Sequence, residues 1–390
     1  MTDSQNVGVT AAKGFRAAGV TAGIKASGTP DLALVVNDGP SFAAAGVFTS
    51  NRVKAAPVLW SEQVLKAGRL TAVVLNSGGA NACTGPLGFQ DTHATAEKVA
   101  EQLDTGAGEV AVCSTGLIGE RLPMDILLPG VEQAVAALDA DGGRAAAIAI
   151  KTTDTVHKTA EFTSPAGWTV GGMAKGAGML APGLATMLVV ITTDAAVEAP
   201  ALDAALRAGA RTTFDRIDSD GCMSTNDTVL LLASGASGVV PDGAEFAEAV
   251  RTVSADLARQ LIGDAEGASK DIRIDIVNAA TEEEAVEVAR TVARNNLLKC
   301  AIHGEDPNWG RVLAAIGTTA AAFDPDRLDV AINGVWVCRD GSVGEDRNLV
   351  SMKDREVVIT ADLKAGPAAV SVWTNDLTAD YVHENSAYST

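Results

Sequence analysis

The stretch from residue 170 to residue 194 constrains the fold of this 390-residue chain more than any other part of it. Its first half consists of glycine and other small residues, with Lys175 as its single charge. Its second half opens on a continuous apolar run from Met187 to Ile191. Such a run is typical of a strand that is buried on both faces. The pattern predicts a glycine-rich loop that leads into a core strand.

Thr186 lies at the junction of the two halves and allows two interpretations. In the simpler one, which the pattern alone favours, Thr186 is merely the first residue of the strand. In the other, the neighbouring glycines permit a tight backbone in which the Thr186 hydroxyl attacks the carbonyl of the small residue Ala185. The chain would then be cut. Thr186 would carry its hydroxyl beside a free α-amine of pKa about 7.7–8.0, which can act as general base.

A second candidate is the pair Thr115-Gly116, which follows a short apolar strand predicted over residues 109–113. A hydroxyl beside a glycine amide can direct two donors at one point, as an oxyanion hole requires. The residue pattern alone favours a simple turn here.

The run K-G-A-G-M-L-A-P-G-L-A-T-M-L from Lys175, followed by T-T-D-A from Thr192, resembles the self-cleaving segment of the ornithine acetyltransferase family. This family is also called bifunctional glutamate N-acetyltransferase/ornithine acetyltransferase. Further matches keep the family's order and span essentially the whole chain: N-S-G-G-A-N-A-C-T-G from Asn76, C-S-T-G-L-I-G from Cys113, T-T-D-T from Thr152, S-T-N-D-T from Ser224, D-A-E-G from Asp264, D-P-N-W-G-R from Asp306, and E-N-S-A-Y-S-T at the C-terminus. One such motif would be weak, whereas eight in order are strong.

The resemblance implies an α/β fold of the layered αββα type, with sheets sandwiched between helices. It also implies self-cleavage between Ala185 and Thr186, giving an α chain of residues 1–185 and a β chain of residues 186–390. The two chains are expected to stay together and to form a heterotetramer of two α and two β chains. The cut is not a domain boundary, because apolar chain continues across it.

The resemblance also assigns roles to individual residues. Thr186 is the nucleophile, and Thr115 and Gly116 stabilise the oxyanion. The residues expected to bind substrate are Thr152, Lys175, Thr186, Glu266, Asn385 and Thr390. We assign the Lys175 ammonium to an amino-acid carboxylate and Glu266 to the cationic end of ornithine, because opposite charges attract. The chain departs from the family at residues 157–158, where histidine replaces the usual proline before the lysine.

The implied reaction moves an acetyl group from N2-acetylornithine to L-glutamate in arginine biosynthesis. It passes through an acetyl-threonine ester and yields ornithine and N-acetylglutamate. The sequence leaves open whether acetyl-CoA is a second donor. Two alternatives are a self-cleaving amidohydrolase of N-acyl amino acids, in which water takes the acyl group, and a non-catalytic small-molecule binder on the same scaffold.

Composition and failed motifs exclude several classes of function. With 49 acidic and 30 basic residues, a net charge of −19 and no dense Lys/Arg block, we expect no nucleic-acid partner. The five cysteines contain no C-x-x-C, which indicates neither a disulfide framework nor a zinc site. A loose dinucleotide fingerprint at residues 176–181 is followed by Pro182 and a strand rather than the required helix. We therefore expect no cofactor and no metal.

The distribution of apolar residues also predicts where in the cell the protein is located. No apolar run approaches the roughly 18–20 residues of a membrane span, and the polar start of the chain has no signal-peptide core. We expect a cytoplasmic protein with no membrane segment.

Periodicity predicts a mixed α/β chain. The expected strands are 31–36, 43–49, 71–75, 109–113, 187–191, 271–277, 356–363 and 368–374, and the expected helices are 91–103, 131–138, 145–150, 201–214, 244–262 and 281–295. We expect the first two strands to be neighbours, Asp91 or Thr92 to cap a helix, and Thr281 to open another through a capping box. An Asn333-Gly334 turn predicts a hairpin.

Overall fold

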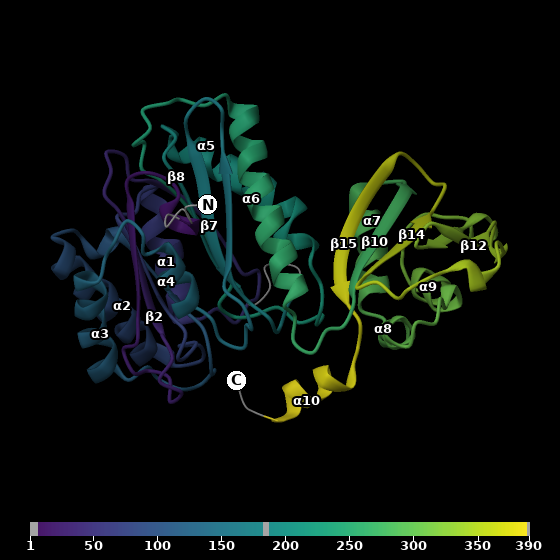
Figure 1. Cartoon of the computed structure of the whole chain (residues 1–390), viewed down its shortest axis with the longest axis horizontal. Coiled ribbons are helices and arrows are strands. Elements are labelled where there is room, and N and C mark those ends of the chain that lie inside the picture. The colour runs from purple at the N-terminus through teal and green to yellow at the C-terminus, as the bar shows by residue number, and fades with distance from the viewer. Residues whose placement is uncertain (1–6, 182–186, 388–390) are drawn as a thin grey trace, which may run out of the picture.

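The computed structural model describes residues 7–181 and 187–387 as a layered α/β body with a C-terminal unit beside it (Figure 1). Two sheets form the middle of the layered body. The first sheet has the order β1 (Phe15–Val20), β2 (Leu32–Asn37), β4 (Ala72–Asn76), β5 (Val110–Ser114). The second has the order β3 (Ala43–Phe48), β9 (Thr228–Ala233), β8 (Leu188–Thr193), β7 (Thr169–Lys175), β6 (Lys158–Thr163).

Helices cover the outer faces of both sheets. The first sheet packs against α2 (Gly85–Leu103) and α3 (Met124–Ala136), and the second packs against α5 (Ala199–Thr212) and α6 (Gly243–Gly263). Two shorter helices, α1 (Ala56–Val64) and α4 (Gly143–Ala149), contact strands of both sheets. The layers follow in the order helix, sheet, sheet, helix, so the predicted αββα sandwich is confirmed.

The C-terminal unit has its own sheet and core. Its sheet has the order β13 (Ser342–Val343), β12 (Val335–Arg339), β11 (Asp329–Ile332), β14 (Glu356–Asp362), β10 (Asp271–Ala279), β15 (Ala368–Asn375). Residues of α7 (Glu282–Ala293), α8 (Asn296–His303) and α9 (Trp309–Ile316) share this core. The last helix, α10 (Ala379–Ala387), leaves the unit and returns toward the layered body (Figure 1). Among helices of the described residues, none is both long and apolar enough to cross a membrane.

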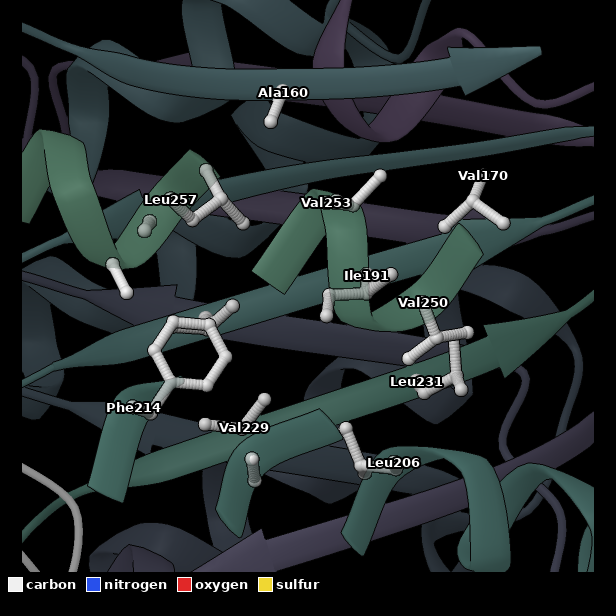
Figure 2. Packing of buried hydrophobic residues seen from close by; sticks show 14 of the residues in the cluster. Ala160, Val170, Ile191, Leu206, Phe214, Val229, Leu231, Val250, Val253 and Leu257 are labelled. Atoms are coloured by element: carbon white, nitrogen blue, oxygen red, sulfur yellow. The ribbon is translucent and has the colours of Figure 1, made fainter. Parts of the chain in front are cut away.

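Strand β8 occupies the centre of the second sheet, between β7 and β9. All six of its residues are buried. Val189 and Ile191 belong to the core under α5 and α6, whereas Leu188 and Val190 face the first sheet. Figure 2 shows Ile191 in the core with Val250 of α6. The apolar run therefore forms the doubly buried strand that was predicted.

The glycine-rich half of the central stretch differs from the prediction. Residues 169–175 form β7 rather than a loop, and they pair antiparallel with β8. Gly171 is required there because a neighbouring backbone approaches too closely for a side chain, and Gly172 is in a crowded position. A Cβ at Gly171 would lie 2.0 Å from the Gly8 carbonyl oxygen, and one at Gly172 would lie 3.1 Å from a Leu257 methyl.

Other expectations had mixed outcomes. The strand at 43–48 is not a neighbour of β2; it lies at the edge of the second sheet, where its strand partner is β9, which is distant in sequence. Helix α2 begins at Gly85, so Asp91 is a mid-helix residue that binds Arg121 at 2.6 Å rather than a cap. Thr281 does cap α7 by accepting from the Glu284 amide at 3.1 Å. The Asn333-Gly334 hairpin is confirmed as β11–β12.

Replacing Leu231 by alanine should test the importance of the core under α5 and α6 (Figure 2). Leu231 is fully buried on β9, so the cavity should lower the free energy of unfolding by about 2–5 kcal/mol. Urea unfolding followed by circular dichroism measures the change. The control is Val240→Ala, at a side chain that is 79% exposed, which should stay within about 0.5 kcal/mol of the parent. Equal effects in both variants would contradict this account of the core.

Candidate active site

Thr115 lies directly after β5, in a loop held rigidly by its neighbour strand. Its amide donates to the Asn76 carbonyl at 3.0 Å, and Asn76 in turn donates through Nδ2 to the Gly79 carbonyl at 3.0 Å. Thr115 is buried, with only 3% of its surface exposed. The ends of β4 and β5 thus fix the position of the Thr115 hydroxyl.

Gly116 has a backbone conformation that only glycine adopts easily, with φ of 130°. A Cβ at this position would also lie 2.8 Å from the Gly79 nitrogen. Two constraints therefore require a glycine at residue 116: its positive φ angle and the close approach of the adjacent loop. The turn predicted by pattern exists, and its residues remain candidates for an oxyanion hole.

Asn226 joins this loop to the second sheet. It precedes β9, and its buried side-chain amide donates to the Ala80 carbonyl at 2.7 Å and to the Ser114 carbonyl at 2.8 Å. One amide group thereby fixes two loops from one sheet against a loop from the other. This bridge sets the spacing between the Thr115 loop and the strands β8 and β9.

Lys175 ends β7 and points at Thr115. Its Nζ lies 3.3 Å from Thr115 Oγ1, although 60 residues separate the two in the chain. The lysine is only 2% exposed. Burial lowers the pKa of Lys175 and the Lys158 charge lowers it further, while the carboxylates of Asp154, Asp227 and Glu266 oppose the shift. Two residues predicted from the sequence are thus in direct contact.

Asp154 is the buried carboxylate that balances these lysines. Its Oδ1 accepts from Lys158 Nζ at 2.6 Å and from the Gly176 amide at 2.6 Å. Burial alone would raise the pKa of Asp154, but the charges of Lys175 and Lys158, with these hydrogen bonds, hold it at about 2. Asp154 is therefore ionised throughout the neutral range.

Thr152 and the segment before Glu266 are connected through the same network. The Thr152 amide donates to Asp154 Oδ2 at 3.0 Å, and Lys158 Nζ makes a second bond, at 2.5 Å, to Asp264 Oδ2. Lys158 is fully buried between the two carboxylates. The central cation of the network is therefore the first residue of β6, directly after the departure from the family at residue 157.

Glu266 follows Asp264 and lies against the glycine segment after Lys175. Its amide donates to the Ala177 carbonyl at 3.0 Å. A Cβ at Gly178 would come within 2.6 Å of its carboxylate, so a side chain at residue 178 would displace the carboxylate from this position. The Glu266 carboxylate and the Lys175 ammonium thus line the same part of the structure with opposite charges.

Asn385 lies on α10 and is exposed, with its Nδ2 donating to the Tyr381 carbonyl at 3.0 Å. The helix is anchored near the glycine segment by Tyr381, whose phenol is hydrogen-bonded to Asp220. Asp220 also accepts from the Leu180 amide at 2.7 Å. No described contact joins Asn385 itself to Lys175, Thr115 or Thr152, so only its helix is brought to this region.

The structure thus brings Thr115, Gly116, Thr152, Lys175 and Glu266 together through direct contacts and the Asp154–Lys158–Asp264 network. Ala185, Thr186 and Thr390 lie outside the described residues. Sequence reasoning missed Asp154, Lys158, Asn226, Asp220 and Tyr381. The first three lie in or next to quoted motifs, but nothing in the sequence shows that they are buried. Tyr381 carries no local signal at all.

Two further features bear on what this site could bind. In the described part of the chain, no group of three or more His, Cys, Asp or Glu residues is placed to hold a metal ion. An open pocket between α5 and α7 is lined by Arg211, Arg216, Glu282 and Arg290 among others, and contains none of the predicted site residues.

Replacing Asp154 by asparagine should expose the energetic role of this carboxylate. The change leaves buried cations undercompensated, and we expect the free energy of unfolding at pH 7 to fall by about 3–5 kcal/mol. Because folding depresses the pKa of Asp154 from 3.8 to about 2, its contribution is full above pH 3.8 and is lost as the pH falls through about 2. The difference between parent and variant should shrink over that range in denaturant titrations.

The matched control is Asp203→Asn, which breaks an exposed pair with Arg207 on α5. That change should alter the free energy of unfolding by less than about 1 kcal/mol. An Asp154→Asn protein as stable as its parent at pH 7 would show that the carboxylate does not hold the network together.

Comparison with known proteins indicates the same family as the sequence motifs do. The ArgJ family matches residues 16–390. A Streptomyces coelicolor protein named "Arginine biosynthesis bifunctional protein ArgJ" is 78% identical over 381 residues, which are 98% of this chain and 99% of the relative. A protein of the same name from Mycobacterium leprae is 59% identical over 389 residues, covering 98% of this chain and 96% of the relative. Among solved structures, ornithine acetyltransferase complexed with ornithine from Mycobacterium tuberculosis is 65% identical over 47% of this chain and 97% of its own, with a TM-score of 0.45. This chain belongs to the ArgJ family.

Proposed function

We propose that the acetyl group of N2-acetylornithine passes to L-glutamate through the hydroxyl of Thr186. The activity class rests on the family, since the chain is an acetyltransferase of arginine biosynthesis by its near-complete match to bifunctional relatives. The structural observation that carries the proposal is the approach of Lys175 Nζ to Thr115 Oγ1 at 3.3 Å. It places a buried cation beside the proposed oxyanion site, eleven positions before Thr186 in the chain.

The reaction would proceed in two half-reactions. The Thr186 oxygen attacks the acetyl carbonyl of N2-acetylornithine, the carbon–nitrogen bond breaks, and ornithine leaves with the proton that Thr186 releases. The glutamate amine then attacks the ester, and the proton it loses returns to the Thr186 oxygen. Thr115 and Gly116 would stabilise the oxyanion in both steps.

Substrate recognition would use the opposite charges near this point. Lys175 would bind the amino-acid carboxylate and Glu266 the cationic end of ornithine. Thr152, fixed by Asp154, would line the same site, and Asn385 and Thr390 would close it from the C-terminal helix side. Buried charges of opposite sign recognise a zwitterionic amino acid more strongly than exposed ones, because water screens them less.

Self-cleavage would separate residues 1–185 from residues 186–390. Strand β7 precedes the proposed cut and β8 follows it, and the two are paired from Val170 with Thr193 to Lys175 with Leu188. Backbone hydrogen bonds along this pairing, and the shared cores on both faces, support the proposal that the two chains stay associated. The heterotetramer and the cytoplasmic location stay predictions.

A second donor is also part of the proposal. The relatives carry the word "bifunctional" in their names, which supports acetyl-CoA as an additional source of the acetyl group.

The alternative activity, that of a self-cleaving amidohydrolase, differs from the proposed one in one measurable respect. It would release ornithine from N2-acetylornithine at a rate that does not depend on added glutamate.

Replacing Thr186 by alanine tests the nucleophile. We expect the parent protein to appear in denaturing mass spectrometry as two fragments with a new N-terminus at Thr186, and to release ornithine only when glutamate is present. The variant lacks the attacking oxygen, so it should stay at full length and lose at least about 1,000-fold in exchange rate. Thr212→Ala, at a threonine on the exposed end of α5, is the control and should cut and exchange normally. Normal exchange by an uncut parent would contradict the proposal.

Deleting residues 384–390 tests the proposed role of the C-terminus. We expect turnover to be abolished, because Asn385 and Thr390 are removed, while self-cleavage and the unfolding midpoint remain unchanged. The single change Asn385→Ala should reproduce part of the loss as a raised KM for N2-acetylornithine. His383→Ala, an exposed neighbour on the same helix, should leave KM unaffected. Full activity of the deletion would remove both residues from the site.

A further inference from the structure

Lys25 lies in the loop between β1 and β2, and one buried carboxylate holds this part of the loop in place. The side chain of Asp31 is fully buried. Its two oxygens accept from the backbone amides of residues 22, 23, 24 and 25 at distances from 2.6 to 3.1 Å. Four amides bound to one carboxylate leave this backbone little freedom, so the starting point of the Lys25 side chain is fixed.

The ammonium of Lys25 reaches the loop that contains Thr152. Its Nζ donates to the Lys151 carbonyl at 2.6 Å and to the Pro30 carbonyl at 3.1 Å, although 126 positions separate Lys25 from Lys151. The carbonyl carbon of Lys151 is bonded to the Thr152 nitrogen, so covalent geometry keeps Lys25 Nζ within about 5 Å of that nitrogen. A positive charge therefore lies beside a residue that we propose binds substrate.

The loop that carries Lys25 also lies against the proposed oxyanion loop. A Cβ at Gly78 would lie 2.2 Å from Cγ2 of Ile24, so these two backbones pack closely. The next residue, Gly79, packs in turn on Gly116, where a Cβ would lie 2.8 Å from the Gly79 nitrogen. Lys25 therefore belongs to the surroundings of the proposed site and not to a remote surface.

The Lys25 ammonium is half-buried and is hydrogen-bonded to no carboxylate among the described residues. Both of its acceptors are neutral carbonyls, and an ammonium has three N–H donors. Burial lowers the pKa of Lys25, whereas the charges of Asp31 and Asp154 raise it. The charge of Lys175 acts on it as well, so the two lysines share one electrostatic environment. One N–H donor and a positive charge therefore remain for an anion.

The proposed reaction makes two amino acids of opposite side-chain charge use one site. The side chain of ornithine ends in an ammonium, which Glu266 would bind, whereas that of glutamate ends in a carboxylate, which Glu266 would repel. Lys175 would bind the amino-acid carboxylate that both substrates have. Lys158 is fully buried between two carboxylates and is already neutralised. Lys25 has the charge, the open donor and the position that the glutamate side chain requires.

We propose that Lys25 binds the side-chain carboxylate of glutamate and so makes the second half-reaction selective for an acidic acceptor. This inference rests on the proposed function, in which glutamate takes the acetyl group. The two substrates would then use separate groups for their side chains, Glu266 for ornithine and Lys25 for glutamate. A neutral acceptor such as glutamine would leave the ammonium without a carboxylate, and its acetylation would be slower for that reason.

The test replaces Lys25 by glutamine, which removes the charge but keeps an N–H donor for the Lys151 carbonyl. Glutamate and glutamine compete as acceptors with N2-acetylornithine as donor, and mass spectrometry gives the ratio of their acetylated products. We expect kcat/KM for glutamate, and with it this ratio, to fall by about 10-fold or more, because a charge-assisted hydrogen bond is lost. In a two-step exchange, kcat/KM for N2-acetylornithine reports only the first half-reaction, and it should change by less than about 3-fold.

Two further variants separate charge from structure. Lys25→Arg keeps the positive charge and should keep the preference for glutamate; it also covers the case in which the glutamine variant does not fold. Lys66→Gln is the matched control, at an exposed lysine whose Nζ donates to Gln63 at 2.7 Å, and it should behave as the parent does.

Two results would overturn the proposal. If Lys25 only holds the Lys151 carbonyl, the glutamine variant should lose the same factor in kcat/KM for glutamate, glutamine and N2-acetylornithine. An arginine variant that transfers acetyl groups without preferring glutamate would contradict the role of the charge. The outcome is separable from that of the proposed function: a parent that moves no acetyl group to glutamate refutes that function, whereas an active parent whose preference survives in Lys25→Gln refutes only the role of Lys25.

Discussion

The ionised carboxylate of Asp154 is the interaction on which the proposed site depends. It lies among buried groups and is bonded to Lys158 and to the Gly176 amide at 2.6 Å each. Without it, the low-dielectric interior would contain two lysine charges facing each other with weaker compensation. The same carboxylate also accepts from the Thr152 amide. It therefore fixes the loop that contains Thr152, the end of β7 and the first residues after β7.

Two buried aspartates that both interact with the Lys175 charge illustrate how environment decides the pKa of a carboxyl group. Asp154 has cations and amide donors around it, and its pKa is about 2. Asp227 is equally buried but has a single cation facing it, and its pKa is raised. Identical side chains within one site therefore have pKa values that are shifted in opposite directions.

The sequence predicted the parts of the fold that follow from the pattern of apolar residues, because that pattern indicates which residues are buried. The apolar run at Met187–Ile191 predicted a doubly buried strand, and β8 is such a strand. Strand neighbours were not predictable, because pairing depends on residues that are far apart: β3 pairs with β9, some 180 positions away along the chain. The glycines at 171 and 172 predicted a loop, whereas they lie in β7, which pairs with β6 and β8, and Gly8 and Leu257 lie close to them. Sequence alone does not distinguish a flexible glycine from a crowded one.

The sequence by itself determined the family, the layered α/β class and the motif residues, because these properties are written in residue order and local pattern. Only the tertiary structure decided that Lys175 contacts Thr115, that Asn226 bridges both sheets, and that Asp154 and Asp227 both interact with the charge of one lysine. The physical reason is that burial and charge proximity are set by segments from distant parts of the chain. A carboxyl group's proton affinity depends on those neighbours and not on its own sequence position.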